Sequence, residues 1–190
     1  MAQRVDGRFE KSARLTPANG ITLLRLLASP VVVVLIVVLG VSWVSVLVWV
    51  ALASTDFVDG WVARRQGPTT SGAFLDPLAD KFLVLGALGA LALAGATGWL
   101  PVALIAGREL AISAYRTRVA RRGVSVPARP LAKAKTASQD LAVTLLLLPG
   151  VGDHYGFVGR DVLWAAVVLA LASGAQYFLD ARRRPALSGG

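Results

Sequence analysis

Six apolar stretches dominate the sequence, and each is close to the roughly 20 residues that a helix needs to cross about 30 Å of hydrocarbon. They lie near residues 20–40, 43–63, 73–95, 98–117, 134–150 and 161–179. Hydrophobic residues make up 55% of the 190-residue chain, which is too much apolar surface for an ordinary soluble domain of this size. We therefore expect an all-α integral membrane protein, with one domain of six transmembrane helices over residues 19–181.

Basic residues gather at alternate junctions between these stretches. They precede the first stretch, follow the second, separate the fourth from the fifth and close the chain: Arg4, Arg8, Lys11, Arg14; Arg64, Arg65; Arg116, Arg118, Arg121, Arg122, Arg129, Lys133, Lys135; Arg182, Arg183, Arg184. The other junctions, near 40–43, 95–99 and 150–160, contain only Arg160. By the positive-inside rule, both termini and the polar cluster of the second and third stretches face the cytoplasm. We expect a multi-pass protein of the cell membrane.

The two ends of the chain are predicted to be basic segments outside the bilayer. Residues 1–18 form a basic juxtamembrane segment, in which 5–13 can make a short interfacial helix or belong to a disordered tail. Residues 182–190 form a basic cytoplasmic tail. The net charge of +9 does not point to nucleic acid, because the excess follows one membrane side without a reading helix or aromatic platform. Anionic groups such as the headgroups of membrane lipids explain it better.

Four aspartates interrupt the second and third stretches. Asp56 and Asp59 are three residues apart, and Asp76 and Asp80 are four apart, so on helices each pair lies on one face. Carboxylates at bilayer depth are costly unless they are paired or bind metal, and four that converge would repel one another without divalent cations. An all-carboxylate set favours Mg²⁺ or Mn²⁺ over zinc. The pattern predicts a site for two metal ions near the cytoplasmic face.

Small residues and an arginine accompany the aspartates. Gly60 and Gly72 each lie one turn from an aspartate and leave room for a ligand, and Ala63 adds only a methyl group to the same surface. The guanidinium of Arg64 suits phosphate oxygens. Two other interpretations stay open at this point. The aspartates could be structural ion-pair partners, or they could conduct ions in a small cation transporter. Intramembrane prenyltransferases also use Asp-rich helices, but they lack this glycine and Ala-Arg framing.

Two further polar groups lie close to the predicted cytoplasmic ends of the stretches. The first group could hold a second phosphate or could simply mark topology, and it consists of Arg108, Glu109, Arg116, Lys133, Lys135, Thr136 and Gln139. Topology explains Arg108 less well, because this residue lies about two turns inside its stretch. Asn19, Thr22 and Arg25 open the first stretch. They are explained either by helix capping and snorkelling or by a role in ligand binding.

These motifs resemble those of the CDP-alcohol phosphotransferase family. Its signature is Asp-x2-Asp-Gly-x2-Ala-Arg, a spacer, then Gly-x3-Asp-x3-Asp, and all eight specified residues are present. The spacer between Arg64 and Gly72 has seven residues, one fewer than in most members, which affects a predicted loop. The string from Gly107 to Ser113 and the Lys133-x-Lys135-Thr136 run are similar to the phosphatidylglycerolphosphate synthase branch.

The resemblance implies an enzyme that transfers a phosphatidyl group from CDP-diacylglycerol to an alcohol and releases CMP. The acceptor of the branch is glycerol 3-phosphate; phosphatidylglycerol, giving cardiolipin, inositol phosphate and serine are alternatives within the family. Members are commonly homodimers.

The resemblance also assigns roles to residues. Metal ions would be held by Asp56, Asp59, Asp76 and Asp80, and Asp80 would also act as the catalytic base. The CDP donor would contact Thr22, Asp56, Asp59, Gly60, Ala63, Arg64 and Gly72. The acceptor phosphate would be bound by Arg108, Arg116, Lys133 and Lys135.

Overall fold

The computed structural model describes residues 17–66, 72–121, 130–150 and 156–183. Within these ranges the chain forms six helices and no strand: α1 (Pro17–Leu39), α2 (Trp43–Gln66), α3 (Gly72–Leu93), α4 (Trp99–Arg121), α5 (Pro130–Leu147) and α7 (Gly156–Arg183). Each helix overlaps one predicted apolar stretch. The all-α class is confirmed, and the helix ends fall within a few residues of those expected.

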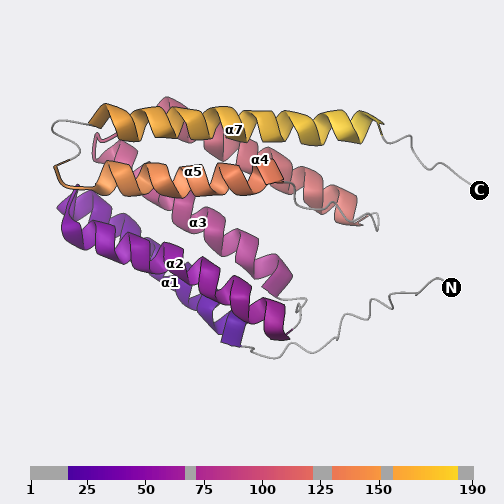
Figure 1. Cartoon of the computed structure of the whole chain (residues 1–190), viewed down its shortest axis with the longest axis horizontal. Helices are drawn as coiled ribbons and strands as arrows, with labels where there is room; N and C mark the ends of the chain where they lie inside the picture. Colours follow the sequence, from indigo (N-terminus) through magenta and orange to yellow (C-terminus); the bar gives the residue numbers. More distant parts are fainter. Residues whose placement is uncertain (1–16, 67–71, 122–129, 151–155, 184–190) are drawn as a thin grey trace, which may run out of the picture.

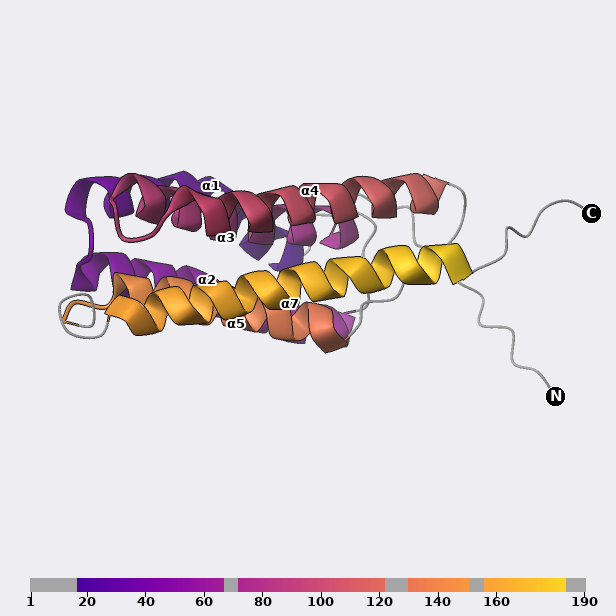
Figure 2. The ribbon, with the colours of Figure 1, turned by 90° about the horizontal axis from the view of Figure 1, so that it is seen from above.

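The helices lie side by side and alternate in direction along an elongated bundle (Figures 1 and 2). α1 begins and α7 ends at one end of the bundle, where α2 also gives way to α3 and α4 to α5. The other three changes of direction lie at the opposite end (Figure 1). This arrangement gathers on one end the junctions that the sequence marks as basic.

Glycine ends two of the helices at the opposite end of the bundle. Gly40 follows α1 with φ of 60°, and its N–H donates to Ile36 O at 2.9 Å. Gly95 follows α3 with φ of 77°, and the next N–H, that of Ala96, donates to Leu91 O at 2.9 Å. Positive φ costs glycine little, so the chain can turn there and satisfy carbonyls that the helix leaves open.

The bundle has an apolar interior and an apolar outer surface. Trp49, Ile36, Leu88 and Leu163 are fully buried in the core. Large apolar side chains of α1 such as Val38 are exposed on the outside. An apolar exterior is expected where lipid takes the place of water.

Two helices in the described residues are long and apolar enough to cross a membrane, over Thr22–Leu39 and Gly156–Tyr177. The count of six crossings stays a prediction. The predicted interfacial helix at 5–13 lies outside the described residues, as does most of the predicted C-terminal tail; α7 itself continues to Arg183.

Candidate active site

The four aspartates lie on two consecutive helices. Asp56 and Asp59 are in the second half of α2, and Asp76 and Asp80 are in the first half of α3. α2 ends and α3 begins at the same end of the bundle (Figure 1). The backbone therefore brings both pairs toward one end, as the sequence predicts.

The side chains of residues 56–66 and 72–77 lie outside the description, and with them those of Asp56, Asp59, Arg64 and Asp76. The description includes the side chain of Asp80, which is partly buried. Among the described side chains, no three potential ligands gather around a common point. The donor set itself fits a hard divalent cation, because it consists of carboxylate oxygens on helices that the backbone brings to the same end.

Arg25 on α1 is buried, with only 1% of its surface exposed. Its Nε donates a 3.1 Å hydrogen bond to Oγ1 of Thr55 on α2, the residue before Asp56. The snorkelling interpretation of Arg25 is therefore wrong, because the guanidinium points into the protein. Thr22, one turn earlier, is equally buried. Asn19 does not cap the helix either, since α1 already begins at Pro17.

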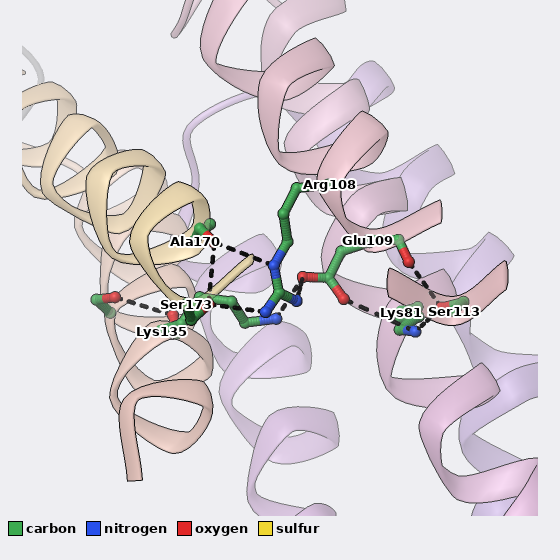
Figure 3. Close-up of polar contacts among 8 residues, drawn as sticks. Lys81, Arg108, Glu109, Ser113, Lys135, Ala170 and Ser173 are labelled. Carbon is green, nitrogen blue, oxygen red and sulfur yellow. Dashed lines mark hydrogen bonds and ion pairs between the residues drawn. The ribbon is translucent and has the colours of Figure 1, made fainter. Parts of the chain in front are cut away.

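A second polar group surrounds Glu109 on α4, and we call it the Glu109 cluster: Lys81, Arg108, Glu109, Ser113, Lys135 and Ser173. Oε1 of Glu109 accepts from Arg108 Nη1 at 2.8 Å and from Lys135 Nζ at 2.5 Å. The Nζ of Lys81 lies 3.7 Å from the other carboxylate oxygen (Figure 3). Three cations from α3, α4 and α5 thus converge on one carboxylate.

Arg108 also joins the cluster to α7. Its Nε donates to the carbonyl oxygen of Ala170 at 3.1 Å, and its Nη2 donates to Oγ of Ser173 at 2.7 Å (Figure 3). The stem of Arg108 lies over Gly174, where an added Cβ would come within 3.4 Å of Cγ. The guanidinium is therefore fixed by neutral oxygens on α7 as well as by the acid beside it.

The centre of the Glu109 cluster is buried, and the cluster carries excess positive charge. Glu109 is 4% exposed and Lys135 is 6% exposed. Isolated buried charges are costly, so an anion would stabilise a buried group that has more cations than acids. One turn from Lys135, the amide nitrogen of Gln139 is buried without a hydrogen-bond partner among the described residues. The region thus offers more donors than acceptors, which suits a phosphate.

The predicted acceptor residues separate into two kinds. Arg108 and Lys135 meet in the Glu109 cluster. Arg116 and Lys133 are exposed to the surroundings of the bundle. The sequence did not predict that Lys81 belongs to this group or that Glu109 lies at its centre. A lysine in an apolar stretch, directly after Asp80, was the available signal for Lys81, since a cation at bilayer depth needs a partner.

A helical bundle with membrane-length helices, paired aspartates and a buried cationic cluster is typical of a membrane enzyme that handles phosphate groups. The family model of CDP-alcohol phosphatidyltransferase matches residues 15–172, and this chain belongs to that family. The resemblance drawn from the aspartate motif is thereby confirmed.

Three curated relatives are similar to this chain over 70% to 96% of its length. A probable phosphatidylglycerophosphate synthase of Mycobacterium tuberculosis is 38% identical over 190 residues, covering 96% of this chain and 90% of the relative. A CDP-diacylglycerol--glycerol-3-phosphate 3-phosphatidyltransferase of Rickettsia bellii is 35% identical over 166 residues, covering 84% of this chain and 92% of the relative. One of the same name from Bacillus subtilis is 39% identical over 136 residues, 70% of each chain.

Proposed function

We propose that this protein transfers the phosphatidyl group of CDP-diacylglycerol to glycerol 3-phosphate and releases CMP. The observation that carries the proposal is the complete aspartate motif on α2 and α3 in a chain of this family. The acceptor rests on the names of the relatives and on the Glu109 cluster, whose buried positive charge suits a phosphorylated alcohol better than serine.

The donor site is proposed at the junction of α2 and α3. Asp56, Asp59, Asp76 and Asp80 would hold two divalent cations, Mg²⁺ or Mn²⁺, which when bound neutralise the diphosphate of the donor. The cytidine diphosphate would also contact Thr22, Gly60, Ala63, Arg64 and Gly72. The burial of Thr22 and Arg25 supports a place for α1 in this site, because Arg25 also bonds to Thr55, the residue that precedes Asp56.

Asp80 is the proposed catalytic base. In the transfer step, the acceptor hydroxyl gives its proton to the carboxylate of Asp80 while its oxygen attacks the phosphorus that carries the lipid. The bond from that phosphorus to the bridging oxygen breaks, and CMP leaves with the bridging oxygen. A positioned carboxylate of this kind typically contributes about 10²–10⁴-fold to the rate.

The acceptor phosphate is proposed to bind Arg108, Arg116, Lys133 and Lys135. Arg108 and Lys135 would hold it in the buried part of the site, and the exposed Arg116 and Lys133 would attract it. The donor keeps its acyl chains in lipid while the acceptor is water-soluble. We therefore place the site near the cytoplasmic interface. The proposed protein is a homodimer in the cell membrane, in which residues 19–181 form a six-span domain and both termini are cytoplasmic.

An acceptor screen tests the proposal. Purified protein in detergent is supplied with labelled CDP-diacylglycerol and Mg²⁺, and CMP release is measured with glycerol 3-phosphate, inositol phosphate, phosphatidylglycerol or serine. We expect transfer with glycerol 3-phosphate, its loss with a chelator and its return with added Mg²⁺. Preference for another acceptor contradicts the proposed substrate, and absence of CMP release with every acceptor contradicts the proposed reaction and leaves the cation transporter as the alternative.

A further inference from the structure

We propose that Glu109 is a positioning residue for the acceptor phosphate, which holds Lys135 in place beside Arg108. The inference rests on the proposed function, because it concerns how the acceptor site is built. Glu109 would act through the two cations rather than by touching the substrate.

The contacts of Glu109 show how it can do this. Oε1 accepts from Arg108 on one side and from Lys135 on the other, at 2.8 and 2.5 Å. The guanidinium and the ammonium are therefore neighbours across a single oxygen. Two like charges this close repel strongly in a buried environment unless an acid lies between them.

Lys135 depends on Glu109 more than Arg108 does. Arg108 has its own attachments on α7, to Ala170 O and Ser173 Oγ. Among the described residues, the ammonium of Lys135 bonds to Glu109. A lysine side chain is flexible and its ammonium is strongly hydrated, so without the acid it would be expected to turn toward water. Loss of Glu109 should thus displace Lys135 while leaving Arg108 in place.

The charges that remain suit the substrate. Lys81, Arg108 and Lys135 together carry two more charges than Glu109 neutralises. A phosphate monoester carries close to two negative charges at neutral pH, because its second ionisation lies near pH 6. The Glu109 cluster and one acceptor phosphate would therefore be nearly neutral together, and Lys81 becomes a third cation of the site that the sequence did not assign.

The competing explanation is that Glu109 only ties helices together, since it contacts side chains from α3 and α5. The two explanations differ in what the Glu109→Gln variant does. A positioning role raises KM for glycerol 3-phosphate about tenfold and leaves KM for CDP-diacylglycerol and the thermal unfolding temperature near the wild-type values. A purely structural role lowers the unfolding temperature and moves both KM values together.

A double-mutant cycle with Lys135→Met makes the test specific. If Glu109 acts through Lys135, the double variant Glu109→Gln, Lys135→Met has the same acceptor KM as Lys135→Met alone, within about threefold. This comparison does not need the single Glu109→Gln variant to fold. A further tenfold rise in the double variant would overturn the inference. Asp161→Asn, an exposed acid on α7, is the matched control and should leave both KM values unchanged.

The outcomes separate this inference from the proposed function. Wild-type protein that transfers to no phosphorylated acceptor overturns both. Wild-type protein that uses glycerol 3-phosphate, with an unchanged acceptor KM in Glu109→Gln, overturns the role of Glu109 alone.

Discussion

The indole Nε1 of Trp49 on α2 donates a 3.0 Å hydrogen bond to Oγ1 of Thr144 on α5. The Thr144 hydroxyl in turn donates to the carbonyl oxygen of Asp140 at 2.7 Å. Trp49 is fully buried, so its N–H has no water to turn to. The bond joins helices that are far apart in the sequence and fixes their relative height in the bundle.

Thr144→Val should lower stability. Valine has nearly the shape of threonine but cannot accept the indole proton, and a buried donor left without a partner costs about 1–3 kcal/mol. Chemical unfolding in detergent, followed by tryptophan fluorescence, measures the loss. Ser54→Ala is the control, because Ser54 is exposed and its hydroxyl donates to the carbonyl oxygen of Val50 in its own helix, and it should change stability little. Equal stability of the two variants would contradict a structural role for the bond.

Asp80→Asn should abolish transfer without unfolding the protein. The amide keeps the size of the side chain but cannot take the acceptor proton, so CMP release is expected to fall about 10²–10⁴-fold. The unfolding temperature should stay within a few degrees of wild type, and donor binding should persist in part. Near-normal turnover in this variant would remove Asp80 from the role of base.

Lys135→Met should mainly raise KM for glycerol 3-phosphate, by about tenfold or more, because one charge-assisted contact to the phosphate contributes about 1.5–3 kcal/mol. KM for CDP-diacylglycerol should be unchanged. Steady-state kinetics with each substrate varied in turn separates the two. Arg118→Gln, an exposed cation on α4, serves as the control and should show wild-type kinetics. Identical acceptor saturation in Lys135→Met and wild type would assign Lys135 to topology.

Gly159→Ala should destabilise the packing of α7 on α5. A Cβ at this position would lie 3.0 Å from Cδ2 of Leu146 and 3.3 Å from its backbone nitrogen, so the helices would have to move apart. Gly89→Ala on α3 is the matched control, since its Cβ would meet nothing within 4 Å, and it should stabilise the helix by up to about 1 kcal/mol. Thermal unfolding compares the pair, and the opposite order would contradict the close approach of α5 and α7.

The lengths and positions of the apolar stretches predicted most of the helices. The stretch predicted at 43–63 is the helix Trp43–Gln66, and those predicted at 20–40 and 73–95 are the helices Pro17–Leu39 and Gly72–Leu93. The ends moved by a few residues because polar residues such as those at 64–66 continue a helix that hydropathy alone cuts short.

The candidate site was predictable only where its residues lie close together in the sequence. The aspartate pairs follow from spacing on α2 and α3. The Glu109 cluster takes side chains from α3, α4, α5 and α7, so their meeting depends on how the helices pack, which no spacing along the chain reveals. The sequence did not predict the burial of Arg25 for the same reason. At the start of a hydrophobic stretch, the sequence does not distinguish a cation that points outward from one that points inward, and only the packing of α1 on α2 brings Arg25 to Thr55.

The attachment of Arg108 to Ala170 and Ser173 has a consequence for biogenesis. α7 follows the other described helices in the chain, so they leave the ribosome before it, and until α7 is inserted the guanidinium lacks both oxygens that α7 supplies. We therefore expect catalytic competence to arise only after α7 has been inserted, so that a chain still lacking this helix does not consume its nucleotide-linked lipid.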